Sequence, residues 1–315
     1  MRRYIIQRVL LIFPTLFLIS FMVFCISRVL PGDVVELMVS ESGYADDEKE
    51  MREMLGLDKP LPVQYFNYMK KIITKGDLGV SLWSGEPVRD EIAKRLPISL
   101  NLTLLSILWT IIFGVTFGVL SAIEQDSWMD YVLRSVAIGG LSIPNFWLAT
   151  MLLVFGSIWF SWIPPMNYVP FMKDPIANIS QLLIPSFILA LARAAAIMRM
   201  TRTMMLEVMR EDYIRTARSK GLSTWLVIVR HALKNAMIPV VSITGIQLAF
   251  LIGGTVVMES IFVLPGMGRY MLEAINWRDY PAIQGVNLVI ATGIVLINLI
   301  VDLTYGFLNP KIRYQ

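Results

Sequence analysis

The sequence predicts an all-α membrane protein with six transmembrane helices and both termini in the cytoplasm. Of its 315 residues 56% are hydrophobic, and the mean hydropathy of +0.61 is too high for an ordinary soluble domain. Long uncharged runs recur along the chain, as spanning helices require. Basic residues gather beside these runs, as expected for loops on the cytoplasmic side. This accounts for the net charge of +4 without a nucleic-acid partner.

Residues 1–30 contain the N-terminus and the first predicted helix. Arg2, Arg3 and Arg8 precede an uncharged run over 9–27, which is long enough to span a bilayer. A signal peptide is the alternative, but no small-x-small cleavage site follows the run, so we expect a retained span. Residues 31–96 are polar and predict a small extracytoplasmic cap, with short helices over 46–55 and 62–73.

Residues 97–315 hold the other five predicted spans. The second, over 98–123, contains Gly114 and Gly118, a small-xxx-small pair that lets helices approach closely. The third, over 132–160, contains Pro144, which predicts a kink. The fourth, over 175–200, carries Arg193. This arginine either extends to the cytoplasmic headgroups or lines a substrate path, and both readings stay open.

The fifth span covers 235–258 and the sixth covers 282–301, with an outer loop between them. Pro265, Gly266 and Gly268 supply the tight backbone turns that a re-entrant loop needs. A well-formed hairpin without any docking function explains them equally well. Glu259 is either a polar residue at the rim of a pathway or a helix end in water.

The loop over 201–235 is the most distinctive stretch of the chain. Between residues 199 and 234 there are eight basic and three acidic residues, which places this loop in the cytoplasm. Ile214, Ala217 and Gly221 share one helical stripe, and the glycine can end the helix in a left-handed turn. We expect a compact helical knob. The alternative is a solvated loop that only sets the orientation of the neighbouring spans.

This loop, EDYIRTARSKGLSTWLVIVRHALKNA, resembles the cytoplasmic EAA-type loop of ATP-binding-cassette (ABC) importer permeases. The family triplet falls on Arg215, Thr216 and Ala217, of which only Ala217 agrees. KGDLGVSLWSGEPVRDEIAKRLP and ESIFVLPGMGRYMLEAINWRDYPAIQG resemble two further blocks of the branch that imports dipeptides, oligopeptides or nickel, in its first, B-type permease. The resemblance covers essentially the whole chain.

The resemblance implies a permease subunit of the bacterial inner membrane that imports peptides or a similar small solute. Its partners would be a second six-helix permease subunit, two ATP-binding subunits and an extracytoplasmic solute-binding protein. ATP and Mg would be used by the partner subunits, with no cofactor bound by this chain. The loop would form the coupling helix on an ATPase, through Tyr213, Ile214, Ala217, Gly221 and His231. The candidates for the pathway or the outer loop are Arg193, Glu259, Pro265, Gly266 and Gly268.

Catalytic motifs are missing from the sequence. There is no P-loop, nucleophile elbow or His-Glu-x-x-His pair. Cys25 and His231 are the only residues of their types and are far apart, so neither a metal site nor catalytic residues are expected. A self-sufficient secondary transporter or channel is the alternative function, although the spans lack the acidic or histidine relays of many carriers. A membrane-embedded enzyme or an assembly protein is a weaker alternative.

Overall fold

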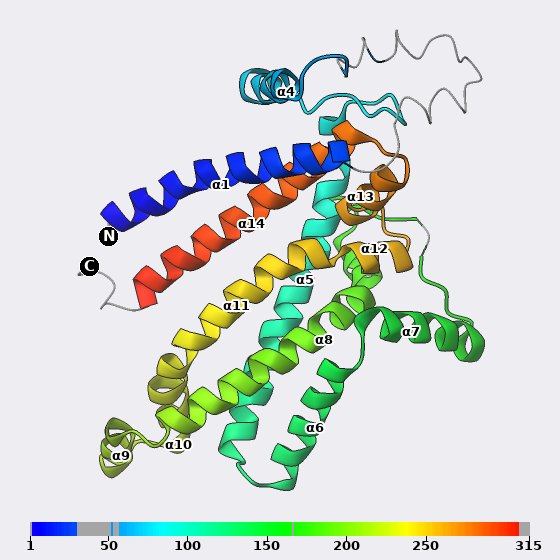
Figure 1. Cartoon of the computed structure of the whole chain (residues 1–315). Helices are drawn as coiled ribbons and strands as arrows, with labels where there is room; N and C mark the ends of the chain where they lie inside the picture. The colour runs from blue at the N-terminus through cyan, green and yellow to red at the C-terminus, as the bar shows by residue number, and fades with distance from the viewer. Residues whose placement is uncertain (1, 30–51, 53–56, 166, 309–315) are drawn as a thin grey trace.

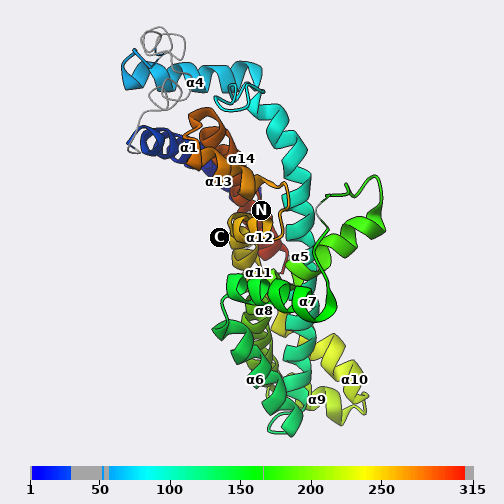
Figure 2. The same cartoon turned by 90° about the vertical axis from the view of Figure 1, so that its right-hand side faces the viewer.

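The computed structural model describes residues 2–29, 52, 57–165 and 167–308 (Figures 1 and 2). Regular structure in these residues is helical, apart from one isolated bridge between Val80 and Pro87. Five helices are long and apolar enough to cross a membrane, and a sixth span is added if the bent pair α6–α7 counts as one. The all-helical membrane fold is therefore confirmed, with five or six candidate spans.

The long helices are α1 (Arg2–Val29), α5 (Val88–Ile123), α8 (Pro175–Val208), α11 (Lys234–Gly254) and α14 (Tyr280–Leu308). In Figure 1, α1, α14, α11 and α8 lie side by side in that order, and α5 crosses behind them. The short helices α12 (Val256–Ile261) and α13 (Met267–Asn276) lie near the start of α5. The helices α9 (Asp212–Ser219) and α10 (Thr224–Leu226) lie at the opposite end of the molecule.

The predicted close approach at Gly114 and Gly118 is confirmed, and it joins α5 to α8. A Cβ atom on Gly118 would lie 2.5 Å from the Cβ of Thr201, and one on Gly114 would lie 2.7 Å from a methyl carbon of Ile197. Only glycine allows the two backbones to come this near. These contacts make α5 and α8 the central packed pair of the fold.

The predicted kink at Pro144 is wrong, because the helix breaks there. α6 (Trp128–Ser142) ends before Ile143, which has extended backbone angles, and Pro144 immediately precedes α7 (Asn145–Phe160). A residue that precedes proline is driven out of the helical region by the proline ring, so the helix ends instead of bending. The axes of α6 and α7 differ in direction by 96°.

The other predicted boundaries also shift. α5 begins at Val88, inside the segment predicted as the cap, and α8 continues to Val208, beyond the predicted end at 200. The fifth predicted span is divided into α11 and α12. The helix predicted over 62–73 is confirmed as α4 (Leu61–Lys75), whereas most of the helix predicted over 46–55 lies outside the described residues.

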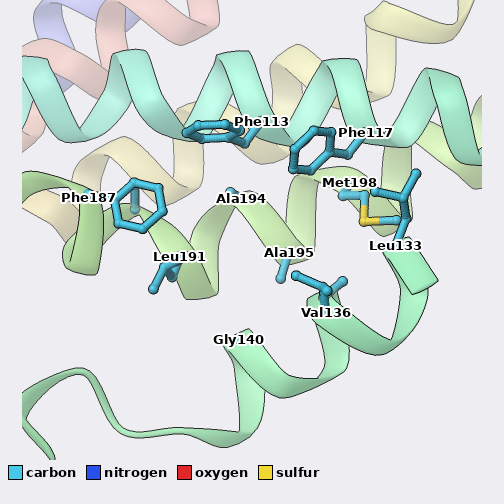
Figure 3. Close-up of a pocket in the computed structure, with 12 residues that line it drawn as sticks. Phe113, Phe117, Leu133, Val136, Gly140, Phe187, Leu191, Ala194, Ala195 and Met198 are labelled. Atoms are coloured by element: carbon cyan, nitrogen blue, oxygen red, sulfur yellow. The ribbon is translucent and has the colours of Figure 1, made fainter. Parts of the chain in front are cut away.

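α5, α6 and α8 enclose an apolar pocket of about 270 Å³ (Figure 3). On one side, Phe113 and Phe117 of α5 and Phe187 of α8 form a row of rings with centroids 5.3 and 5.7 Å apart. On the other side, α6 approaches α8 through small residues. The residues that line the pocket are Phe113, Phe117, Leu133, Val136, Ala137, Gly140, Phe187, Ala190, Leu191, Ala194, Ala195 and Met198. Arg193 of α8 is not among them.

Candidate functional site

The loop between α8 and α11 folds into the compact knob that the sequence predicts. Ile214 and Ala217 of α9 are 0% and 6% exposed and pack with Met205 of α8 and Val227. They lie three residues apart, which places both on the face of α9 that is turned toward this core. Gly221 follows the helix with a φ of 77°, the left-handed turn expected from the sequence.

Polar contacts hold α9 to the start of α11. The segment η2 (Val227–Leu233), a π-helix, leads directly into α11. The Tyr213 hydroxyl accepts a hydrogen bond of 2.7 Å from the Asn235 side chain, which also donates to the carbonyl oxygen of His231 at 3.2 Å. His231 therefore takes part through its backbone. Tyr213 and Asn235 fix the orientation of α9 against the long helix that follows.

The opposite face of α9 is exposed and positively charged. The only ion pair that involves it among the described residues joins Arg215 to Asp212 at 3.3 Å, and both side chains are at least three-quarters exposed. Such a pair contributes little stability in water. The charges are therefore available to a partner surface. The exposed residues of this face are Asp212, Arg215, Thr216, Arg218, Ser219 and Lys220, with three basic residues and one acidic residue.

A buried ion pair joins α6 to α8 near the knob. Asp130 is fully buried, and Arg202 donates to it from Nε at 2.9 Å and from Nη2 at 2.7 Å. The same carboxylate accepts hydrogen bonds from the Ser121 hydroxyl and from the backbone N–H of Asp126. All of these donors converge on one charge, so the turn between α5 and α6 and the end of α8 form one unit. The sequence reading missed this pair. The signal that the sequence offered was Asp130, an acidic residue at the start of an apolar run.

A groove of about 570 Å³ runs from this ion pair to the start of α9. It contains charges of both signs. The residues that line it are Arg202, Thr203, Leu206, Glu207, Arg210, Glu211 and Asp212. The ion pair and the knob are therefore connected through the last turns of α8.

At the opposite end of the molecule, Glu259 is fully buried, so neither sequence-based reading of this residue matches its surroundings. Its Oε1 accepts a 2.6 Å hydrogen bond from the Ser99 hydroxyl of α5. Its Oε2 accepts a 2.9 Å hydrogen bond from the backbone N–H of Arg269. The Ser99 oxygen in turn accepts from the backbone N–H of Met267 at 2.8 Å. The Glu259 carboxylate thus accepts a hydrogen bond from one of the free N–H groups at the N-terminus of α13. Its negative charge is also favourable at the positive end of the helix dipole.

The glycines at the start of α13 make room for this arrangement. A Cβ atom on Gly266 would lie 2.4 Å from the Glu259 carboxyl carbon, and one on Gly268 would lie 2.6 Å from the Cα of Val256. Pro265 is exposed beside them. α13 therefore sits directly on α12, in a contact that any larger residue would prevent.

A second buried carboxylate lies at the other end of α13. Asp279 is 2% exposed; it accepts a hydrogen bond from the Ser81 hydroxyl at 2.5 Å and caps α14 through the N–H of Ala282 at 3.2 Å. Gly79 has a φ of 90°, and a Cβ atom there would lie 3.3 Å from Pro281. Two sequence blocks 198 residues apart therefore meet at this point.

Next to Asp279 lies a cavity of about 380 Å³ with aromatic walls. Trp83 and Trp277 stack at a centroid separation of 3.5 Å, and both are partly exposed. The Arg95 guanidinium lies 4.3 Å from the centre of the Tyr270 ring. Burial, with a smaller contribution from the Asp279 charge, raises the pKa of the Tyr270 hydroxyl to about 12. Among the described residues this hydroxyl has no hydrogen-bond partner of normal geometry, because the nearby Ser81 hydroxyl donates to Asp279.

Arg193 lies within α8, away from both ends of the helix, and is half-buried. Its Nη1 donates to the backbone oxygen of Leu189 at 3.0 Å. The structure thus divides the predicted site residues into three places: the knob, the segment from Glu259 to Gly268, and Arg193 between them. Within the described part of the chain, no group of three or more His, Cys, Asp or Glu residues could hold a metal ion.

Comparison with known proteins gives matches over nearly the whole chain. Residues 114–314 match the family of the binding-protein-dependent transport system inner membrane component, and residues 1–103 match the N-terminal family of such membrane components. The chain is 39% identical over 315 residues to the glutathione transport system permease protein GsiC of Escherichia coli (strain K12), with all of both chains covered. It is 40% identical over 311 residues to a putative peptide transport system permease protein of Brucella abortus (strain 2308), with 99% of each covered.

A solved structure of the MetNI methionine ABC transporter, in an inward-facing conformation, contains a chain of similar fold. The TM-score is 0.52 at 15% identity, and the match covers 69% of this chain and 96% of that one. At this level of identity the likeness concerns the fold alone.

Proposed function

The chain belongs to the family of inner membrane components of binding-protein-dependent transport systems, and on this basis we propose that it carries short peptides, glutathione among them. It is a permease subunit of an ABC importer and a multi-pass protein of the bacterial inner membrane. The names of the two relatives support peptides as the cargo. A self-sufficient carrier or channel is the function that these matches disfavour.

In the assembly that we propose, this chain pairs with a second six-helix subunit to enclose the pathway. Two ATP-binding subunits lie beneath, and a solute-binding protein delivers the cargo to the outer side. Both termini of this chain would then lie in the cytoplasm, as the basic residues near its ends favour. ATP and Mg would be bound by the partner subunits, since the sequence has no P-loop.

The observation that carries this proposal is the knob. α9 is held by a core of its own chain through Ile214 and Ala217, by the turn at Gly221 and by the Tyr213–Asn235 contact. Its exposed face offers cations to a partner surface. A helix that is packed on one face and exposed on the other can transmit a displacement from a partner to its own chain, because the packed face keeps it from moving independently.

We propose that the displacement passes from α9 along the end of α8 and through the Arg202–Asp130 pair to α6. Closure of the ATP-binding subunits would thereby favour one of two pathway conformations over the other. Ile214 and Ala217 would act from inside the knob, with the contact itself made by the exposed face.

The experiment is co-purification of the ATP-binding subunits with the double variant Arg218→Glu/Lys220→Glu. Both side chains are exposed, so the knob should stay folded while the charge of its surface reverses. The matched control is Lys71→Glu/Lys75→Glu, on exposed positions of α4. Loss of the ATP-binding subunits and of uptake only in the first variant is expected. Retention of both, at normal protein levels, would exclude α9 as the docking element.

Replacement of Ala217 by tryptophan does not separate docking from folding. Ala217 lies in the core of the knob with Ile214 and Met205, and an indole there would overpack that core. The exposed positions therefore give the sharper test. Transport by the purified subunit alone, in liposomes, would favour the self-sufficient carrier.

A further inference from the structure

Arg193 places a positive charge deep in an apolar helix. Eighteen residues separate it from the start of α8 at Pro175. The next charged residue of the helix, the exposed Arg199, follows six residues or about 9 Å after Arg193, and the Arg202–Asp130 pair follows nine residues or about 14 Å after it. A cation at such a depth is costly and marks a functional site by default.

The guanidinium of Arg193 is directed away from the cytoplasmic end of α8. Its Nη1 bonds to the carbonyl oxygen of Leu189, one turn earlier in the helix. Side chains in helices lean toward the N-terminus, and this hydrogen bond holds the arginine in that direction. The geometry therefore differs from that of an arginine extended to the cytoplasmic headgroups, which was one of the two sequence-based readings.

One edge of this guanidinium is unoccupied. The Nε atom is buried and forms no hydrogen bond, and no acidic side chain of the described residues pairs with Arg193. In the same helix, Arg202 uses its Nε and Nη2 atoms to hold both oxygens of Asp130. At Arg193 the chain itself covers Nε, so an incoming carboxylate would meet the guanidinium at Nη2, which is neither buried nor hydrogen-bonded within the described residues.

We propose that Arg193 binds a free carboxylate of the transported solute at this level of the pathway, an inference that rests on the function proposed above. The side chain is half-buried, so a ligand can reach it from the open side. A short peptide carries such a group at its C-terminus. An acidic residue of the second permease subunit is the competing partner for the same edge.

The test uses the complete transporter with its binding protein in liposomes. Uptake is measured for one peptide with a free C-terminus and for its C-terminal amide, after both forms have been shown to bind to the binding protein. The variants are Arg193→Gln and Arg193→Lys. The matched control is Arg199→Gln, an exposed arginine on the same helix.

In Arg193→Gln, kcat for the free-acid peptide should fall about tenfold to a hundredfold, the range for loss of a hydrogen-bonded charge. Its rate for the amide should not change. The rate of Arg193→Lys for the free-acid peptide should lie between those of the wild type and Arg193→Gln, because lysine keeps the charge but lacks the planar guanidinium that presents Nη2. Arg199→Gln should transport both peptides as the wild type does.

Wild-type rates for both peptides in Arg193→Gln would overturn this inference and leave the peptide-importer function intact. Equal loss for both peptides, with the second permease subunit missing from the purified complex, would overturn it in favour of an acid of that subunit. Uptake of neither peptide by the wild-type complex would overturn the proposed cargo and this inference together.

Discussion

Removal of the Ser99 hydroxyl tests how α13 is held in place. This hydroxyl is buried; it donates to Glu259 at 2.6 Å and accepts from the backbone N–H of Met267 at 2.8 Å. Ser99→Ala leaves one carboxylate oxygen and one N–H without partners in a site closed to water. We therefore expect the first turn of α13 to separate more readily from α5.

The magnitude follows from the two groups that lose their partners. Each buried polar group without a hydrogen bond costs about 1–3 kcal/mol, so the sum is about 2–6 kcal/mol. Local opening exposes both groups to water and relieves this cost. The free energy of opening should fall accordingly, and 2 kcal/mol corresponds to about a thirtyfold faster exchange of the amide hydrogen of Met267.

Hydrogen exchange of peptides that cover residues 264–271, followed by mass spectrometry, measures this change. The matched control is Ser106→Ala: Ser106 is also buried in α5, but its hydroxyl donates only to the backbone of its own helix, at Leu102. Adding Glu259→Gln to Ser99→Ala should produce less than the sum of the single effects, because the two residues share one hydrogen bond. Exchange in Ser99→Ala that equals exchange in the control would refute the reasoning.

Three further predictions concern other contacts. Gly118→Ala should reduce the yield of folded protein and lower the midpoint of thermal unfolding by several degrees, because its Cβ would meet α8 at 2.5 Å; Gly139→Ala, with nothing within 4 Å, is the control for both measurements. Asp130→Asn should lower uptake much more than ATP hydrolysis, since an unpaired Arg202 would no longer hold α6; equal losses would contradict a function in transmission. Tyr270→Phe should leave the stability at pH 7 unchanged or raise it by about 1 kcal/mol, because the hydroxyl has no hydrogen-bond partner of normal geometry among the described residues. Burial disfavours the ionised Tyr270 and raises its pKa from 10 to about 12, so the stability of the wild type should fall as the pH rises from 10 to about 12, and Tyr270→Phe should lack this part of the fall.

The features that the sequence predicts well depend on neighbours within a few residues. The apolar runs become α1, α5, α8, α11 and α14. Ile214 and Ala217 share a buried face because helical spacing places them there. Gly221 adopts positive φ because it follows a helix that must end. Each of these outcomes follows from local geometry, which a single sequence contains.

The features that the sequence does not predict depend on residues that are far apart in the chain. Asp130 meets Arg202 across 72 residues, and Ser99 meets Glu259 across 160. Nothing near an isolated acid identifies its donors, so Glu259 could be read as a helix end in water. Pro144 shows the same limit at short range, since its pattern permits both a kinked helix and a broken one.

The three charged centres indicate how the chain can move. The Arg202–Asp130 pair fixes α6 to α8 at the end near the knob, and Glu259 fixes α13 to α5 at the other. Between them, the glycine contacts hold α5 and α8 too close to slide past each other. In the mechanism proposed above, a displacement of α9 would therefore move α5, α6 and α8 together, and the change of shape would occur where these helices meet the others. Arg193 is a residue of α8 and would move with these helices. Its distance from the neighbouring helices would then change, and with it the access of a solute to Arg193.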